Sequence, residues 1–329
     1  MTLTIRSHAI RFHQTGGPEV LQREAVDVPP PAAGEARVRH HAIGLNYIDT
    51  YHRSGLYPLT LPSGLGQEGA GVVEAVGAGV SDVRPGDRVA YAGGPLGAYA
   101  EVRNVPAHLL VPLPEAISFE HGAAMMLQGL TAQYLLRSTY RVQAGETVLI
   151  HAAAGGVGTI ACQWAKALGA TVIGTVGTDS KAELARANGC AHVIVTSRES
   201  FAARVREITG GDGLPVVYDS IGKDTFADSL ACLRRRGLMV LFGASSGAVP
   251  QFDIMELMRR GSLFLTRPTL GDYAASRAEL LAMAEELFAV VASGQVRIAI
   301  GQRFALADAA QAHVDLQARR TTGSTVLLP

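Results

Sequence analysis

The stretch HAAAGGVGTIACQWAKALG, His151–Gly169, indicates the fold class of this chain. The apolar run Thr147–Ala152 leads into it and is typical of a buried parallel strand. Apolar side chains then recur at helical spacing, at Val157, Ile160, Ala161, Trp164 and Leu168. A strand, a glycine-rich turn and a helix therefore follow one another here.

The turn carries a dinucleotide-binding fingerprint, with Ala153, Gly155 and Gly158 at its three fixed positions and alanine in place of the first glycine. Gly155 and Gly156 let the backbone approach a pyrophosphate, and Gly158 lets the helix pack on the strand. The helix N-terminus, which includes Val157, offers backbone N–H groups to the phosphates. The alternative is an ordinary strand–helix turn that binds no nucleotide.

Outward from this stretch, strands and helices alternate. The predicted further strands are Thr171–Val176, His192–Val195, Pro215–Ser220, Leu238–Gly243 and Ser262–Thr266. Helical patterns lie between them, and the one marked by Phe226, Leu230 and Leu233 is expected to end at Gly237. The pattern predicts an α/β fold with a doubly wound, six-stranded parallel sheet of the Rossmann type.

The chain before about residue 115 has a different texture, with short valine-rich pieces broken by Gly, Pro and Asp. This is typical of a compact β-rich domain. At the other end we expect a helix over 274–293, a strand near 295–300, a helix over 308–320 and a final strand over 324–329. We predict domains at 1–127 and 128–267, with 268–329 returning to the first.

The composition of the chain argues against several classes of function and location. The 329 residues hold 29 basic and 29 acidic side chains, so no net charge draws the protein to nucleic acid or to an anionic membrane. Three cysteines argue against a disulfide framework. We find neither a signal peptide nor an apolar run long enough to span a membrane, and expect a cytoplasmic protein.

A second glycine motif, GLGQEG at Gly64–Gly69, is a literal G-x-G-x-x-G. It follows a proline-rich loop and leads into a strand pattern, so it lacks the strand and helix that a phosphate site requires. We interpret it as turns and close backbone packing within the β-rich domain.

The end of the second strand bears on cofactor choice, because NAD sites place an acid there for the ribose 2′-hydroxyl. This chain has Thr175 and Gly177 instead, with Asp179 slightly late and Lys181 beside it. The pattern favours NADPH, with NADH as the weaker cofactor. The alternative is that Lys181 is merely a solvated residue in the first turn of a helix.

These motifs identify a family resemblance that covers essentially the whole chain. The chain resembles the medium-chain dehydrogenase/reductase superfamily, in particular its zeta-crystallin-like NADPH:quinone oxidoreductases. The stretches that carry it include GLNYIDTYHRSGLYP, LQGLTAQYLLR, HAAAGGVG, RRRGLMVLFGASSGAV and GSTVLLP. The resemblance implies a GroES-like catalytic domain, a Rossmann domain that binds NADPH, hydride transfer to a quinone between the domains, and a homodimer through the Rossmann domains.

The resemblance also implies site residues. Those expected near the substrate are Asn46, Asp49, Tyr51, Tyr57 and Arg267. Those expected around the cofactor, besides the fingerprint, are Tyr47, Thr131, Gly177, Thr178, Ser180, Lys181, Thr196, Phe242, Gly243, Ala244, Ser245 and Arg319. Structural alternatives stay open: Asp49 as a helix cap, Tyr51 and Tyr57 as packing aromatics, and Arg267 as an ion-pair partner.

The chain departs from its close relatives at three positions. They place Tyr at Thr196, Asn at Ala244 and Lys at Gln128, so the preference for NADPH depends more heavily on Lys181 and Arg319.

Zinc-using members carry G-H-E where this chain has Gly66-Gln67-Glu68, and a Cys where it has Asn46. The four-cysteine lobe of a structural zinc site is also missing. Amides are poor zinc ligands beside imidazole and thiolate, so we expect no metal. His40 and His41 are adjacent in a strand pattern, which would direct them to opposite faces.

Two other functions remain open. One is NADPH-dependent reduction of α,β-unsaturated carbonyls on the same scaffold. The other is a non-enzymatic role, structural or RNA-binding, as in zeta-crystallin relatives, although the balanced charge makes nucleic acid an unfavoured partner.

Overall fold

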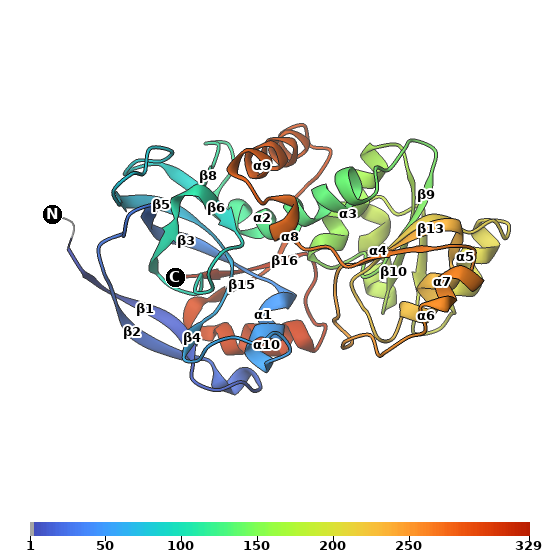
Figure 1. Cartoon of the computed structure of the whole chain (residues 1–329), viewed down its shortest axis with the longest axis horizontal. Coiled ribbons are helices and arrows are strands. Elements are labelled where there is room, and N and C mark those ends of the chain that lie inside the picture. The colour runs from blue at the N-terminus through green and yellow to red at the C-terminus, as the bar shows by residue number, and fades with distance from the viewer. Residues whose placement is uncertain (1–2) are drawn as a thin grey trace. The chain divides into compact units, whose positions relative to one another are not determined.

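The structure, a computed structural model, describes residues 3–329 and divides into two compact units (Figure 1). Unit 1 contains the chain up to Leu130 together with Ala274–Ala284 and Ile298–Pro329. Unit 2 contains Thr131–Tyr273 and Glu285–Arg297. Within the described residues, no helix is both long enough and apolar enough to cross a membrane.

Unit 2 is built on a parallel sheet of six strands in the order β11-β10-β9-β12-β13-β14. Its strands are β9 Thr147–Ile150, β10 Thr171–Val176, β11 His192–Val195, β12 Leu214–Asp219, β13 Leu233–Leu241 and β14 Phe264–Thr266. Its helices are α3 Gly156–Ala167, α4 Asp179–Ala187, α5 Phe201–Ile208, α6 Phe226–Ala231, α7 Met255–Arg259 and α8 Leu270–Tyr273, with a π-helical turn at Leu135–Thr139. The order reverses between β9 and β12, so the predicted doubly wound sheet is confirmed.

One boundary prediction in this unit was wrong. The helix expected to end at Gly237 ends at Ala231, and β13 already begins at Leu233. Gly237 lies inside the strand, where the register against β12 shifts between Leu214 and Val216. Two leucines that fit a helical spacing thus belong to different elements, which periodicity alone does not reveal.

A buried polar network inside unit 2 joins β12 and α6 to His151, the residue that follows β9. The His151 ring lies 2.9 Å from the hydroxyl of Ser229, which donates a hydrogen bond of 2.8 Å to Asp219. The other oxygen of Asp219 accepts the backbone N–H groups of Ile221 and Gly222. Asp219 thereby fixes the start of the loop at the carboxyl end of β12, the edge at which ligands bind in such sheets.

Unit 1 is β-rich. Its strands are β1 Ile5–Phe12, β2 Gln22–Val28, β3 Glu35–Leu45, β4 Ser63–Gly64, β5 Glu68–Val76, β6 Arg88–Ala92, β7 Val102–Pro106, β8 Val111–Pro112, β15 Ile300–Ala305 and β16 Ser324–Leu328. They form a sheet in the order β15-β16-β3-β5-β6-β8, with β7 pairing β3, and a smaller sheet in the order β2-β1-β4. Its helices are α1 Tyr47–Ser54 and α10 Ala309–Gln317, with short 3-10 turns at Pro18–Val20, Ala107–Leu109 and Leu306–Asp308. The long helices α2 Phe119–Tyr134 and α9 Arg277–Ala292 each contribute residues to both units.

The end of the chain follows the prediction with one correction. The strand expected near 295–300 begins only at Ile300, as β15, and pairs with β16 from Ser324 onward. Val296 instead follows α9 closely, because its backbone N–H donates to the carbonyl of Val290. The apolar Val296 is buried there rather than in a strand.

The motif GLGQEG is a turn in unit 1, as predicted. It begins in β4 and leads into strand β5 rather than into a helix. Gly66 has φ +86°, and a Cβ there would lie 2.3 Å from the ring of Tyr99. The motif thus serves backbone packing and lacks the helix that a phosphate site needs.

Candidate functional site

The N-terminus of α3 is built to receive an anion. The first backbone N–H groups of any α-helix lack acceptors within the helix, and a capping side chain usually satisfies one of them. The N-cap of α3 is Gly155, which has no side chain. By contrast, α4 and α5 are capped by the hydroxyls of Thr178 and Ser200. The first turn of α3 therefore keeps its N–H groups and its positive dipole end for a phosphate.

Gly158 explains how closely this helix approaches its strand. A Cβ on Gly158 would lie 2.2 Å from the backbone oxygen of Ala152 and 2.9 Å from the Cα of Ala153. Ala152 itself has φ +52°, which few residues other than glycine adopt. The fingerprint thus holds a tight turn against the helix, and these residues fit the pyrophosphate of a dinucleotide.

The ends of β10 and β11 carry the residues expected at the adenosine phosphate. Gly177, Thr178 and Ser180 are exposed directly after β10, and Lys181 is half-buried in the first turn of α4. Thr196 follows β11 and donates its hydroxyl to the carbonyl of Val176. The carboxyl ends of parallel neighbours meet at one sheet edge, so these residues surround one place.

Arg198 also lies at this edge and was missed by sequence reasoning. Its guanidinium forms a 2.9 Å ion pair with Asp179, in which both side chains are mostly exposed. Its position in the sequence could have indicated it, because Arg198 comes three residues after the end of β11 and two after Thr196. The pairing also neutralises Asp179, the acid nearest to the end of β10.

The loop after β13 is held rigidly. The N–H of Phe242 donates to the carbonyl of Asp219, and that of Ser245 donates to the carbonyl of Ser220. Gly243 is needed there, because a Cβ would lie 2.4 Å from the Ser220 oxygen. Ala244 lies between them, and all four loop residues are partly exposed at the carboxyl edge of the sheet.

Arg267 supports this loop from β14. Its guanidinium donates hydrogen bonds of 2.9 Å to the backbone oxygens of Leu241 and Gly243. The side chain is nonetheless exposed. Thr131, near the end of α2, is almost buried, and it lowers the pKa of the neighbouring Tyr134, which burial raises. Roles for Arg267 and Thr131 toward ligands stay predictions.

In unit 1, Asn46 stands at the start of α1 and links two buried carboxylates. Its backbone N–H donates to Asp49 at 2.9 Å, and its side-chain Nδ2 donates to Glu68 at 2.6 Å. The Oδ1 atom of Asn46 accepts a hydrogen bond of 3.0 Å from Gln128. Ser324 in turn lies 2.6 Å from the Oε1 atom of Gln128. A continuous chain of buried polar side chains results.

Asp49 is fully enclosed at the third position of α1, where it accepts the backbone N–H of the N-cap residue Asn46 in a capping box. It therefore takes part in capping the helix, close to the structural alternative considered for it. The hydroxyl of Tyr99 donates to it at 2.9 Å, while its Oδ1 atom has no hydrogen-bond partner. Burial raises the pKa of Asp49 to about 7, against the lowering effect of the hydrogen bonds from Asn46 and Tyr99. A group so enclosed acts on a substrate only through its neighbours, which are Asn46 and Tyr99.

Helix α10 closes this cluster from the C-terminal part of unit 1. His313 lies 3.1 Å from the Tyr99 hydroxyl, and its Nδ1 atom lies 3.0 Å from the guanidinium of Arg53. Burial, together with the charge of Arg53, lowers the pKa of His313 to about 3. The neutral ring therefore accepts from Arg53 and donates to Tyr99, which leaves the Tyr99 proton directed at Asp49.

Glu68, the second carboxylate, was quoted in the sequence but given no role. It is completely buried in β5, and its Oε1 atom accepts the backbone N–H of Leu127 at 2.7 Å. Gly44 makes room for it, since a Cβ there would lie 2.1 Å from Oε2. Burial raises the pKa of Glu68 to about 8, the hydrogen bonds from Asn46 and Leu127 lower it, and Asp49 raises it further.

An aromatic row lies along α1. The rings of Tyr47 and Tyr51 meet edge to face at 5.6 Å, and those of Tyr51 and Tyr57 at 5.3 Å. Tyr51 is buried between the other two, which are partly exposed. Arg319, exposed after α10, lowers the pKa of Tyr47, which burial raises. Tyr47 and Tyr57 are thus the members of the row with accessible surface.

The positions that hold zinc in other members of the superfamily carry other contacts here. The amide of Gln67 donates to the carbonyl of Gly94, and Asn46 donates to Glu68. Among residues 3–329, no group of three His, Cys, Asp or Glu side chains is arranged to hold a metal ion. His40 is buried between Ala100 and Tyr91, whereas His41 is exposed against Phe119, so the prediction of opposite faces is confirmed.

Comparison with known proteins agrees with this arrangement. Residues 32–115 match the family of the alcohol dehydrogenase GroES-like domain, and residues 156–286 match the family described as zinc-binding dehydrogenase. A quinone oxidoreductase of Pseudomonas aeruginosa is 58% identical, and the match covers 97% of this chain and 99% of that protein. A 2-haloacrylate reductase of Burkholderia is 48% identical, with coverage of 97% and 98%.

Among solved structures, the quinone oxidoreductase of Escherichia coli complexed with NADPH superposes with a TM-score of 0.97. It is 52% identical, and the match covers 98% of this chain and 100% of that one. Both units are therefore shared with it over essentially their whole length. The chain belongs to the quinone oxidoreductase family of the medium-chain dehydrogenase/reductase superfamily.

Proposed function

We propose that this protein is an NADPH-dependent quinone reductase that acts by direct hydride transfer. The observation that carries the proposal is the full-length similarity to quinone oxidoreductases, one of them solved with NADPH. The open N-terminus of α3 supports it, because that terminus fits the pyrophosphate of such a cofactor.

Unit 2 supplies the cofactor contacts. The N–H groups of Gly156, Val157 and Gly158 would hold the pyrophosphate, and Lys181 would meet the 2′-phosphate from the first turn of α4. The rigid loop Phe242–Ser245, braced by Arg267, would bind the nicotinamide end. NADPH, when bound, supplies the hydride that reduces the quinone.

The substrate requires little activation. A quinone is electron-poor, and its reduction gives a phenolate-like anion whose conjugate acid has a pKa of roughly 10, like that of tyrosine. Modest hydrogen bonding and correct placement are then sufficient, without the Lewis acid that alcohol chemistry needs. We propose that the hydroxyls of Tyr47 and Tyr57 donate to the quinone oxygen, that Tyr51 supports their rings, and that Asn46 contributes its amide.

Steady-state kinetics test the proposal. Oxidation of NADPH with benzoquinones and naphthoquinones should proceed at a higher kcat/KM than with any enone or 2-haloacrylate. Enones preferred over quinones would make the protein an unsaturated-carbonyl reductase, the alternative that the 48% identical 2-haloacrylate reductase supports. Metal analysis of the active protein should find less than stoichiometric zinc, and loss of activity with EDTA would contradict a metal-free site.

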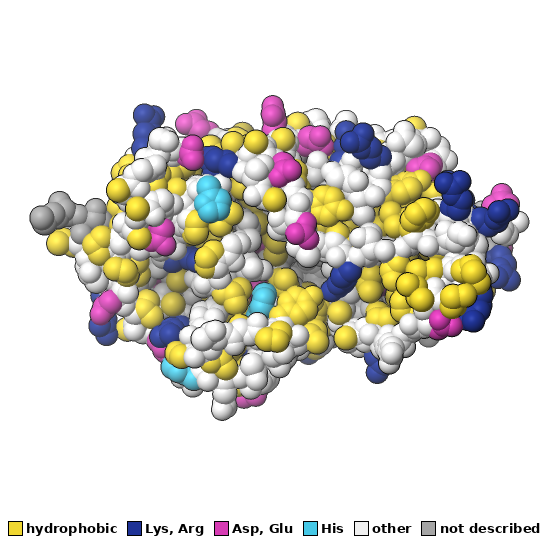
Figure 2. Space-filling view, viewed as in Figure 1, with side chains coloured by type: hydrophobic (Ala, Val, Ile, Leu, Met, Phe, Trp, Pro, Cys, Tyr) yellow, Lys and Arg dark blue, Asp and Glu magenta, His cyan; other side chains and the backbone are white. Residues whose placement is uncertain are grey.

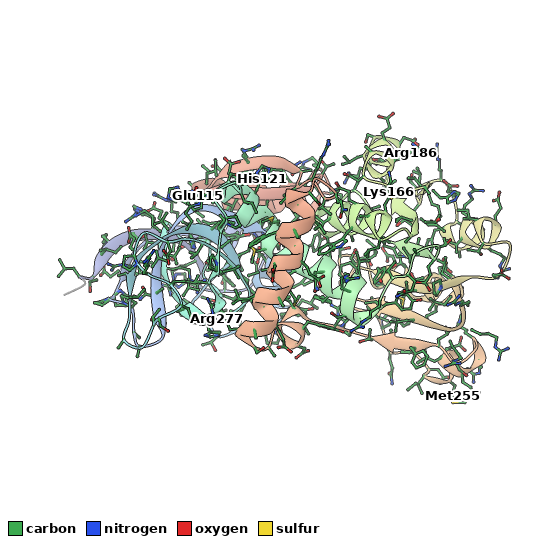
Figure 3. The ribbon with its side chains drawn as sticks, turned by 90° about the horizontal axis from the view of Figure 1, so that it is seen from above. Glu115, His121, Lys166, Arg186, Met255 and Arg277 are labelled. Carbon is green, nitrogen blue, oxygen red and sulfur yellow. The ribbon has the colours of Figure 1, made fainter. Side chains whose placement is uncertain are left out.

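We further propose a homodimer through unit 2. Strand β14 is the edge of its parallel sheet, and an unpaired edge is a ready surface for another chain. Ile254, Met255, Met258 and Phe264 near this edge are all exposed, at 71%, 43%, 58% and 55%. Figure 3 shows Met255 at the periphery of the molecule. A second copy of the chain would cover this apolar surface.

Light scattering tests the assembly. The protein should have twice its chain mass of 34.5 kDa, and Phe264→Asp together with Met258→Asp should reduce it to the single-chain mass. Leu56→Asp, at an exposed leucine of unit 1, is the matched control and should stay dimeric. A wild-type protein of single-chain mass would refute the homodimer.

The cellular setting is also a proposal. Three free, buried cysteines suit a reducing compartment, and we propose the cytoplasm. On the face drawn in Figure 2, basic and acidic side chains are interspersed, a distribution that does not favour a nucleic-acid backbone. Cell fractionation with a salt-dependent RNA gel shift would test both points, and tight RNA binding without quinone reduction would reverse the assignment.

A further inference from the structure

The buried chain from Glu68 to Ser324 in unit 1 has a property that its bond lengths reveal. The single hydroxyl proton of Ser324 has two acceptors within reach, Gln128 Oε1 at 2.6 Å and the backbone oxygen of Ala124 at 2.9 Å. A hydroxyl donates only once, so the chain has two ways of distributing its protons. Asn46 and Gln128 lie between the two ends, and both are amides that can turn over.

In the first setting Glu68 is ionised and only accepts. Asn46 then directs Nδ2 at Glu68 and Oδ1 at Gln128, and Gln128 directs Oε1 at the hydroxyl of Ser324. Every contact has one donor and one acceptor. The backbone oxygen of Ala124 receives nothing from Ser324 in this setting.

In the second setting Glu68 carries a proton on Oε2 and donates it to Asn46 Oδ1. Both amides turn over, so that Asn46 Nδ2 donates to Gln128 Oε1 and Gln128 Nε2 donates to Ser324. The Ser324 proton then goes to Ala124, which accounts for the second acceptor. The heavy atoms keep their places, because exchanging O and N of an amide leaves its outline unchanged.

We propose that Glu68 is a positioning residue for quinone reduction. Through this hydrogen-bonded chain, the presence or absence of a proton on Glu68 determines whether the Asn46 amide presents its oxygen or its nitrogen to the buried carboxylate. This rests on the proposed function, in which Asn46 serves the substrate. Burial of this chain favours settings in which its members stay paired, since Asn46, Glu68, Gln128 and Ser324 are each at most 7% exposed. The second setting keeps the four side chains paired and gives up only the contact of the Asn46 side chain with the backbone N–H of Asp49. Among titratable groups, Asp49 raises the pKa of Glu68, and the charge of Glu68 in turn raises the pKa of Tyr91 and of Tyr99.

The raised pKa of Glu68, about 8, puts both settings within a measurable range of pH. The chain has only three asparagines, Asn46, Asn104 and Asn188, so protein labelled with ¹⁵N-asparagine gives three side-chain amide signals. Asn104→Asp and Asn188→Asp assign the Asn46 signal by elimination. We expect this signal to differ between pH 6 and pH 9 in the wild type.

Glu68→Gln is the decisive variant, because its amide donates to Asn46 while its oxygen still accepts from Leu127. Its Asn46 signal should match that of the wild type at pH 6 and stay there at pH 9. Asp49→Asn is the matched control, since it removes the neighbouring carboxylate and keeps Glu68, and it should retain the pH change. The kcat for quinone at saturating NADPH should lose its pH dependence over this range only in Glu68→Gln, with the Kd for NADPH unchanged within about twofold.

Several results would overturn the proposal. One is a wild-type Asn46 signal that does not change with pH, and another is a Glu68→Gln signal that matches the wild type at pH 9. A turned amide with an unaltered kcat profile would show that Glu68 does not position Asn46 for the reaction. The amide signals do not depend on substrate, so absence of quinone reduction would refute only the proposed function. If Glu68→Gln does not fold, neutron diffraction of the wild type at pH 6 and pH 9 locates the Asn46 deuterons directly, and identical positions would refute the proposal.

Discussion

Gly158→Ala tests how the fingerprint holds its helix. The added Cβ would lie 2.2 Å from the Ala152 oxygen and 2.9 Å from both the Ala152 carbonyl carbon and the Ala153 Cα. These neighbours are backbone atoms, so the helix start or the turn must move by about 1 Å, and overpacking of this kind costs about 1–3 kcal/mol. The movement displaces the same N–H groups that are proposed to hold the pyrophosphate.

Because NADPH binding requires the undisplaced turn, part or all of this cost should appear in the affinity. A cost of 1–3 kcal/mol corresponds to a rise in Kd of roughly 5- to 150-fold. The single tryptophan, Trp164, lies in α3 itself, and quenching of its fluorescence by NADPH measures Kd directly. Thermal melts of the same samples give the loss in Tm, which measures the part of this free energy that destabilises the folded protein.

Gly271→Ala, in α8 of the same unit, is the matched control. Gly271 has no assigned role toward a ligand, and a Cβ there would meet only the Thr269 hydroxyl, at an ordinary distance of 3.6 Å. Its Kd should stay within about twofold of the wild type, since nothing is overpacked. If Gly158→Ala binds NADPH with wild-type affinity and keeps its Tm, the proposed cradle is wrong.

Three further outcomes are expected. Lys181→Met should raise the KM for NADPH about tenfold and leave that for NADH unchanged, because it removes a charged hydrogen bond to the 2′-phosphate; Lys166→Met, at the other end of α3, should change neither. Tyr57→Phe should lower kcat with quinones by about two- to tenfold without altering NADPH affinity, and an unchanged kcat would remove its hydroxyl from the reaction. The pKa of Asp49 is raised from 3.8 in the unfolded chain to about 7 in the folded protein, so between these pH values the folded protein binds one proton more than the unfolded chain. As the pH rises from 4 to 7, the stability of the wild type should therefore fall relative to that of Asp49→Asn, by at most about 1.4 kcal/mol per pH unit. Thermal melts over that range that show a constant difference would refute the shift.

The fold was predictable because its signals are local. The apolar run of β9, the glycines after it and the spacing of α3 are all contained within twenty or so residues, and each element agrees with its neighbours. The boundary at Gly237 failed for the opposite reason. Leu233 fits the helical spacing, yet it belongs to β13, where it pairs with Leu214 of β12 just before the register shifts. Tertiary pairing of that kind leaves no trace in periodicity.

The residues of the candidate site likewise fall into two groups, those that local sequence indicates and those that only the folded structure brings together. The residues of the turn and of the strand ends were identified by position, and the alternative that Asp49 caps a helix agrees with its contacts. Glu68 and Gln128 were not assigned roles, because nothing in the sequence indicates that Gly44 opens a space for a buried carboxylate or that Ser324 reaches Gln128 across nearly two hundred residues. Such networks require the sheet to be assembled first.

The central claim is that this chain reduces quinones with NADPH, and one comparison tests it most directly. The kcat/KM values for a naphthoquinone, an enone and a 2-haloacrylate should be measured in parallel at saturating NADPH on the metal-analysed protein. The account predicts the highest value for the quinone, with less than stoichiometric zinc present. A higher value for the enone or the 2-haloacrylate, or no oxidation of NADPH with any quinone, would contradict it.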